Sequence, residues 1–213
     1  NRNGTKDNYV NRRNKMSFDP PVRMIPDRVP GRICDKIINY GKQLQSQAGV
    51  VGSNDKDSQI RKSNISWFYD ESWIAKWVIR GARDVIEDWG WEVSEPEPLQ
   101  FTIYNAPDGH YTWHKDTYDS RQKEITENDD IYNRQRKVSM VCNITDPSEY
   151  EGGQLEIIDP TAGPDDDETR IIKISKDRGN VIVFPSFLFH RVTPITRGTR
   201  YSLVCWFRGP EFR

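Results

Sequence analysis

The hydrophobic pattern in the first half of the chain predicts two amphipathic helices. The first segment carries apolar residues three or four positions apart, at Ile33, Ile37, Tyr40 and Leu44. Because side chains at this spacing share one face of an α-helix, we expect a helix that begins near Pro30 and ends by Gly49. A second helix is expected after Asp70, a suitable N-cap, with Gly90 as its stop. Its apolar positions are Trp73, Ile74, Trp77, Val78, Val85 and Trp89.

From residue 99 the pattern changes to short runs rich in β-branched and aromatic residues, separated by turn residues. The eight runs are Leu99–Asn105, His110–Asp116, Val138–Thr145, Gln154–Ile158, Arg170–Ile174, Asn180–Phe184, His190–Pro194 and Tyr201–Phe207. Short strands that follow two helices favour two antiparallel sheets with helices packed on one of them. The predicted fold is therefore mainly β with a helical annex (α+β): a double-stranded β-helix, or jelly roll, of about eight antiparallel strands.

The same pattern suggests three stretches within a single domain. Residues 1–29 are polar and broken by prolines, so we expect an N-terminal arm with little regular structure. Residues 30–98 would form a helical support region, and residues 99–213 the double-stranded β-helix core. One insertion, residues 117–137, is highly charged and directly follows a His-x-Asp pair. A long polar loop beside a site is either a lid over that site or a solvated excursion.

Composition narrows the function classes and the cellular setting. The 213 residues have a formal net charge of −1, so no overall basic field favours nucleic acid as a partner. The three cysteines are widely spaced in apolar runs, which is typical of reduced core thiols rather than a disulfide framework. No apolar run approaches the length of a membrane span, and no signal-like segment opens the chain. We therefore expect a soluble, cytoplasmic protein without a membrane partner.

Two of the three histidines lie where they could bind one metal ion together. His114 and Asp116 form a His-x-Asp pair, and residues i and i+2 of a strand point to the same face. His190 begins another predicted strand, which a jelly roll can bring alongside the first. Two imidazoles and one carboxylate leave other coordination positions open, as a non-haem Fe(II) oxygenase requires. A zinc hydrolase uses similar ligands, but its usual His-Glu-x-x-His helix or cysteine pairs do not occur in the sequence.

Arg200 supplies a candidate anion-binding group for the same site. It lies ten residues after His190 and beside the apolar run Tyr201–Trp206, where a buried cation would need an anionic partner. Arginine holds a carboxylate through two parallel hydrogen bonds, which suits an acidic co-substrate such as a 2-oxoacid. The alternative is an outward-facing arginine in a surface salt bridge, and Arg197, in a Thr-Arg-Gly turn, fits that role better. His110 lies among turn residues, so we assign it a structural or substrate-side role rather than a metal-binding one.

Four motifs in the second half of the chain resemble, in order, those of a known enzyme family. Residues Tyr104–Asp116 are similar to the Tyr-x-x-Gly-x-x-Tyr-x-x-His-x-Asp signature of prolyl 4-hydroxylase-type 2-oxoglutarate/Fe(II) dioxygenases. Residues Ser139–Leu155 contain a Gly-Gly-x-Leu sequence that resembles a strand pair of that family. Residues Gly179–Ser186 and His190–Arg200 resemble the closing motifs of bacterial PKHD-type hydroxylases. The likeness extends over residues 99–208 and is looser in the helical region.

This resemblance implies a double-stranded β-helix fold, Fe(II) as cofactor, and 2-oxoglutarate and O2 as co-substrates, with ascorbate as a candidate accessory reductant. It implies that Arg200, helped by the Tyr104 hydroxyl, binds the C5 carboxylate of 2-oxoglutarate, and that Tyr111 and Trp206 line the pocket. The residues that it assigns to the iron are His114, Asp116 and His190. The implied reaction couples oxidative decarboxylation of 2-oxoglutarate to hydroxylation of a substrate C–H bond.

The favoured substrate, also from the resemblance, is a prolyl residue in a peptide or protein. Tyr111, Trp113 and the 117–137 insertion could form a groove for an extended peptide, because proline-rich segments suit aromatic-lined grooves. The alternatives are the same metal chemistry on a nucleic acid or a small molecule, and a non-catalytic jelly-roll binding module. The near-neutral charge disfavours nucleic acid, and the intact set of candidate ligands disfavours the binding module.

Overall fold

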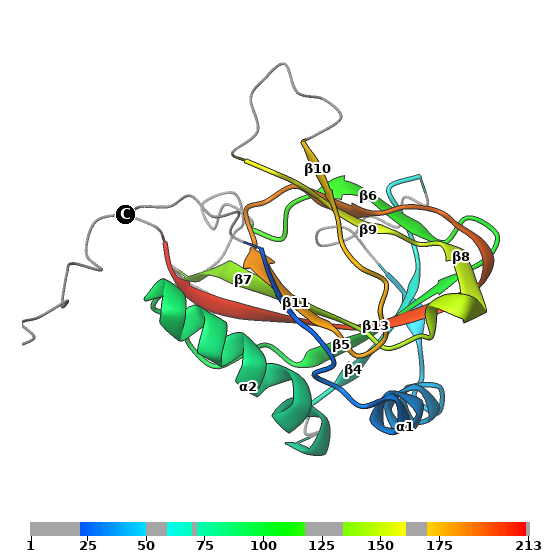
Figure 1. The fold of residues 1–213 in the computed structure, drawn as a ribbon, viewed down its shortest axis with the longest axis horizontal. Helices are drawn as coiled ribbons and strands as arrows, with labels where there is room; N and C mark the ends of the chain where they lie inside the picture. The colour runs from blue at the N-terminus through cyan, green and yellow to red at the C-terminus, as the bar shows by residue number, and fades with distance from the viewer. Residues whose placement is uncertain (1–21, 50–58, 70–71, 118–133, 161–169, 212–213) are drawn as a thin grey trace, which may run out of the picture.

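A computed structural model describes residues 22–49, 59–69, 72–117, 134–160 and 170–211 (Figure 1). Its helices are α1 (Gly31–Gly41), α2 (Ser72–Trp89) and the short 3-10 helix η2 (Pro147–Glu149). Its strands are β1 (Arg23–Ile25), β2 (Gln47–Ala48), β3 (Arg61–Lys62), β4 (Asn64–Phe68), β5 (Leu99–Asn105), β6 (His110–His114), β7 (Arg134–Asn143), β8 (Tyr150–Gly152), β9 (Leu155–Ile158), β10 (Ile171–Lys173), β11 (Val181–Pro185), β12 (His190–Val192) and β13 (Ile195–Pro210).

The strands form two antiparallel sheets that face each other (Figure 1). The large sheet has the order β1-β11-β7-β13-β5-β4-β2, and β8 pairs with β13 beside it. The small sheet has the order β10-β9-β12-β6-β3. Apart from β4-β5 and β9-β10, neighbouring strands are not consecutive in the chain, as in a jelly roll. The predicted mainly-β double-stranded β-helix is therefore confirmed.

Both main helices cover the outer face of the large sheet, on the side away from the small sheet (Figure 1). The period-2 alternation of the central strands explains this arrangement. On β13, Leu203, Cys205 and Phe207 are fully buried against the helices, whereas the alternate residues point between the two sheets. A second apolar cluster, which includes Ile157 and Phe184, fills the rest of the space between the sheets. The large sheet thus has one face for a core and one face for a site.

Both predicted helices are present, with one difference in length. α2 ends at Trp89, and Gly90 has φ +66°, the left-handed conformation expected of a glycine stop. α1 starts directly after Pro30, as expected, but ends at Gly41 rather than near Gly49. A Cβ at Gly41 would lie 2.6 Å from the Phe101 ring, so this glycine lets the helix end pack directly on β5. The expected N-cap of α2, residue 70, lies outside the described residues.

Within the described ranges, all eight predicted strands occur, together with five that were not predicted: β1, β2, β3, β4 and β8. β1 lies in the expected N-terminal arm and pairs with β11 at the edge of the large sheet, so that arm is partly structured. Residues 30–98 contribute three strands as well as the helices. Most of the charged insertion, residues 118–133, lies outside the described part of the chain. Its last residues, 134–137, are not loop but the start of β7.

Two further expectations concern the setting of the protein. All three cysteines of the sequence are free and buried, which confirms that they are core thiols rather than a disulfide framework. Burial raises the pKa of Cys34 to about 11, so this thiol is not activated. Among the described residues, neither helix has the length and apolar character that a bilayer crossing requires.

Candidate metal centre

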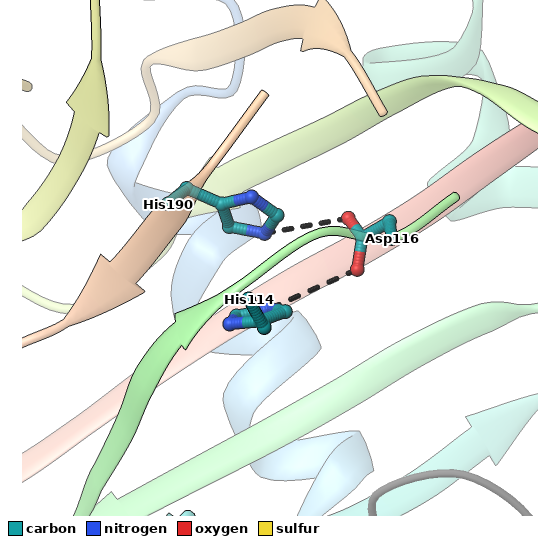
Figure 2. A group of neighbouring side chains, drawn as sticks. All are labelled: His114, Asp116 and His190. Carbon is teal, nitrogen blue, oxygen red and sulfur yellow. Dashed lines mark ion pairs between the residues drawn. The ribbon is translucent and has the colours of Figure 1, made fainter. Parts of the chain in front are cut away.

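The three predicted metal ligands come together at one end of the small sheet (Figure 2). His114 ends β6, His190 begins β12, and the two are paired directly across these neighbouring strands. Asp116 was predicted within the same strand as His114, but it lies two residues beyond the end of β6. The side chains nevertheless converge, and their ligand atoms all lie within 4.8 Å of one another. Direct strand pairing, rather than a shared strand face, accounts for the cluster.

Each imidazole is oriented by a backbone carbonyl two residues earlier in the chain. His114 Nδ1 lies 2.8 Å from the Thr112 carbonyl, and His190 Nδ1 lies 3.0 Å from the Leu188 carbonyl. Because a carbonyl only accepts hydrogen bonds, each Nδ1 carries a proton and donates it. This leaves Nε2 of both rings directed at Asp116, at 3.8 Å from its Oδ1 for His114 and 3.4 Å from its Oδ2 for His190.

The charges of these side chains are coupled. Burial, together with the nearby His190, lowers the pKa of His114 to about 3, so this ring is neutral. Burial also disfavours the charged form of His190, but the Asp116 carboxylate outweighs it and raises the pKa of that ring. For Asp116, burial would raise the pKa, whereas His190 and His114 lower it. The cluster thus stabilises one positive charge between a carboxylate and two imidazole nitrogens, where a metal cation would bind.

The third histidine is used elsewhere. Nδ1 of His110 lies 2.7 Å from the Asp108 carbonyl, and its Nε2 lies 3.0 Å from the Gln59 carbonyl. Both ring nitrogens therefore bind backbone, and the ring is buried. This agrees with its exclusion from the metal set and favours the structural role.

A cavity of about 400 Å³ opens beside the cluster, between the two sheets. Alternation along β13 directs Arg200, Ser202, Val204 and Trp206 into it. The Tyr111 ring stacks on the His114 ring, with 3.4 Å between ring centroids. All the residues predicted to bind the metal or to line the co-substrate pocket are at this cavity: Tyr104, Tyr111, His114, Asp116, His190, Arg200 and Trp206. Trp113, predicted for the substrate groove, is not one of its lining residues. The volume lies within the range of small-molecule sites.

Arg200 is a buried cation, and Lys176, which lines the same small pocket, is a cation as well. Only 3% of its surface is exposed, its Nη1 donates a weak 3.4 Å hydrogen bond to Ser202 Oγ, and its guanidinium lies 5.6 Å from the centre of the Tyr104 ring. Within the described part of the chain, no carboxylate pairs with it. Arg197, by contrast, is exposed and pairs with Glu151 at 2.8 Å. Arg200 is therefore buried and Arg197 is surface-paired, as expected, and the anion-binding role of Arg200 stays a prediction.

One charged group, Glu97, which binds two arginines that line the cavity, was not predicted. Glu97 accepts two hydrogen bonds from Arg136, at 2.8 and 2.7 Å, and one from Arg208 at 2.6 Å. Arg136 also lies flat over the Trp206 ring, with 3.6 Å to its centre. Burial would raise the pKa of Glu97, but its two arginine partners lower it. The sequence around Glu97 gave no indication of this ion-pair cluster, because Arg136 and Arg208 lie far along the chain from it.

Comparison with known proteins adds a decisive observation. The sequence profile described as the 2OG-Fe(II) oxygenase superfamily matches residues 99–208, just over half of the chain. The chain belongs to this superfamily. Membership confirms the sequence-based resemblance and implies Fe(II), 2-oxoglutarate and O2 as cofactor and co-substrates. The residues fit that chemistry, since two imidazoles and a carboxylate are suitable Fe(II) ligands and a buried arginine in the same cavity suits a dicarboxylate.

Individual relatives agree with the superfamily assignment. A PKHD-type hydroxylase of Synechococcus sp. (strain CC9605) is 36% identical over 96 residues, which cover 45% of this chain and 35% of that protein. A Pseudomonas putida prolyl-4-hydroxylase has a TM-score of 0.65 at 18% identity, with 91% and 95% of the two chains covered. A Trichoplax adhaerens prolyl hydroxylase, in complex with a hypoxia inducible factor peptide fragment, has a TM-score of 0.67 at 17% identity, with 89% and 84% covered. At these identities the structural likenesses establish the fold, and the chain matches about a third of the Synechococcus protein's length.

Proposed function

We propose that this chain is an Fe(II)- and 2-oxoglutarate-dependent dioxygenase that hydroxylates a prolyl residue in a peptide or protein. The observation that carries the proposal is the joint placement of the ligand cluster and Arg200 in one cavity. His114, Asp116 and His190 would hold the iron. Bound iron would supply the activation of O2, and the overall reaction converts 2-oxoglutarate, O2 and a C–H bond into succinate, CO2 and an alcohol.

The protein side of this reaction is binding and orientation. Arg200 would hold the far carboxylate of 2-oxoglutarate, and burial makes that charge pair strong. The Trp206 indole nitrogen is buried without a hydrogen-bond partner among the described residues, so a donor is available at the same cavity wall. Free, buried thiols support a reducing, cytoplasmic setting for this chemistry.

The peptide substrate is supported by relatives and by the surface near the cavity. The relatives include proteins described as prolyl hydroxylases, one of them in complex with a peptide. Phe187 and Phe189, which precede β12, are 39% and 43% exposed. Lys115 lies over the Phe189 ring, and Arg191 over the Trp113 ring, at 4.4 and 4.6 Å. The exposed aromatic surface of Phe187 and Phe189, next to His190 in the chain, suits an extended, proline-containing segment.

The test separates the chemistry from the substrate. The protein is incubated with Fe(II), 2-oxoglutarate and a library of proline-containing peptides, and both succinate and a mass gain of about 16 Da on the peptides are measured by mass spectrometry. We expect succinate formation and hydroxylation of proline. Succinate without any hydroxylated proline would remove the prolyl assignment but leave the dioxygenase, with nucleic acids and small molecules as the next substrates to try. A His114→Ala variant that forms succinate as fast as wild type would refute the metal site.

A further inference from the structure

Two buried serines lie directly behind the carboxylate of Asp116. Ser139 Oγ donates a 2.6 Å hydrogen bond to Asp116 Oδ2, and Ser186 Oγ lies 2.8 Å from Ser139 Oγ. Ser139 belongs to β7 and Ser186 follows β11 directly, and both side chains are completely buried. Neither serine resembles a surface residue that happens to be near a site, because each stands in an otherwise apolar stretch of the large sheet.

The hydroxyl protons of this pair can be assigned by counting donors. An ionised carboxylate only accepts hydrogen bonds, and each serine has a single hydroxyl proton. Ser139 gives its proton to Asp116, so it can offer Ser186 only a lone pair. Ser186 must therefore donate to Ser139. The result is a chain with one direction, from Ser186 to Ser139 to Asp116, in which each bond polarises the next.

The backbone of Ser186 holds the same residue from a second side. Its carbonyl accepts hydrogen bonds from the backbone N–H of Asp116, at 2.9 Å, and of Thr117, at 3.1 Å. Its own N–H donates to the Lys137 carbonyl at 2.9 Å, which ties it to β7. Because Asp116 lies beyond the end of β6, these bonds replace the strand pairing that it lacks. Both the main chain and the carboxylate of Asp116 are thus positioned by the large sheet.

We propose that Ser186 and Ser139 form a directed hydroxyl chain that orients the Asp116 carboxylate for metal binding. Ser139 occupies Oδ2 and fixes the rotation of the carboxylate, as the Thr112 and Leu188 carbonyls fix the two imidazoles. All three ligands then have an outer partner, and such partners typically contribute 10- to 100-fold to metal affinity. Ser139 and Ser186 are positioning residues in this view, since neither would touch the metal. The inference rests on the proposed function because it takes Asp116 to be a metal ligand.

The test measures metal affinity without turnover. Protein stripped of metal is titrated with Mn(II) under anaerobic conditions, and free Mn(II) is followed by its electron paramagnetic resonance signal. We expect Ser139→Ala to weaken Mn(II) binding by roughly 10- to 100-fold. Ser186→Ala should weaken it less, because Ser139 would still donate to Asp116. The double variant should bind no more weakly than Ser139→Ala alone, since the second serine acts only through the first.

Two controls separate positioning from a loss of packing. Ser66 on β4 is also buried, and its hydroxyl donates to the Gln45 carbonyl at 3.3 Å, so Ser66→Ala should leave Mn(II) affinity unchanged. Ser139→Thr keeps the hydroxyl and should recover most of the affinity, and thermal melting confirms that each variant is folded. Wild-type affinity in Ser139→Ala, or additive losses in the double variant, would overturn the hydroxyl chain and leave the proposed function standing. Wild-type protein that binds no Mn(II) would overturn both.

Discussion

Replacing Arg200 by methionine should stabilise the protein in the absence of co-substrate and abolish its response to 2-oxoglutarate. Arg200 is 3% exposed; its stabilising polar contacts among the described residues are a weak hydrogen bond to Ser202 and the face of the Tyr104 ring, and the nearby Lys176 is also a cation. Burying an ion costs several kcal/mol even after relaxation. The hydrogen bond to Ser202 offsets about 1 kcal/mol of this cost, and the cation–π contact with Tyr104 offsets about 1 to 2 kcal/mol. A net cost of roughly 2 kcal/mol therefore remains when no anion is bound.

Methionine replaces the unbranched stem of arginine and carries no charge, so Arg200→Met should raise the free energy of unfolding by about 2 kcal/mol. For a chain of this size that corresponds to a rise of about 4 to 8 °C in the melting temperature. Addition of 2-oxoglutarate with Mn(II), at about 100 times its Kd, should stabilise wild type by about 2.7 kcal/mol and the variant hardly at all. The order of the two melting temperatures should then reverse.

The assay is thermal melting of both proteins with and without the two ligands. Arg197→Met is the matched control, because Arg197 lies on the same strand but is exposed and paired with Glu151. It should stay within about 0.5 kcal/mol of wild type and keep the response to 2-oxoglutarate. The reasoning is refuted if Arg200→Met melts below wild type without ligands, or if 2-oxoglutarate stabilises it as much as wild type.

Three further predictions follow from charges and backbone geometry. Because the Asp116 carboxylate raises the pKa of His190, protons compete with the metal for this ring. The Mn(II) affinity, measured by titration at several pH values, should therefore fall as the pH drops through that pKa. An affinity that does not depend on pH would contradict this. Glu97→Gln should cost about 3 kcal/mol at pH 7 by leaving two arginines without their carboxylate. Since the folded-state pKa of Glu97 is lowered, this difference should be full above about pH 4.3 and shrink as the pH falls through the folded-state value, which urea unfolding at several pH values can check. Gly179→Ala should destabilise the fold by roughly 3 kcal/mol or more, because φ is +86° and the new Cβ would lie 2.1 Å from the Val29 carbonyl oxygen. The control Gly90→Ala, with φ +66° and open space around the new Cβ, should cost only about 1 kcal/mol. Equal losses of stability in the two variants would argue against the clash.

The strands predicted from the sequence are those whose own residues show a clear hydrophobic pattern. β5, β11 and the second half of β13 alternate between two buried faces or are apolar throughout, and five or more consecutive residues of each show the pattern. β2 and β3 have two residues each and exist only because β4 and β6 offer pairing partners. A pattern so short cannot be distinguished from a turn, so their omission was unavoidable.

The site, too, has features that the sequence predicts and features that it does not. Residue type and spacing were sufficient to select His114, Asp116, His190 and Arg200, because few side chains can bind a metal or hold a carboxylate. Alternation predicted Asp116 as part of a strand, however, whereas Asp116 lies past the end of β6 and its N–H donates to the Ser186 carbonyl. Local alternation cannot reveal where a strand loses its partner.

The sequence by itself therefore determined the superfamily chemistry, the two helices and the alternation that gives the large sheet one core face and one cavity face. Only the tertiary structure decided what supports the chemical groups. Ser139 reaches Asp116 across 23 residues, and Arg208 reaches Glu97 across 111. Hydrogen bonds and charge pairs at such separations depend on which strands become neighbours, and that is set by packing of the whole chain rather than by any local pattern.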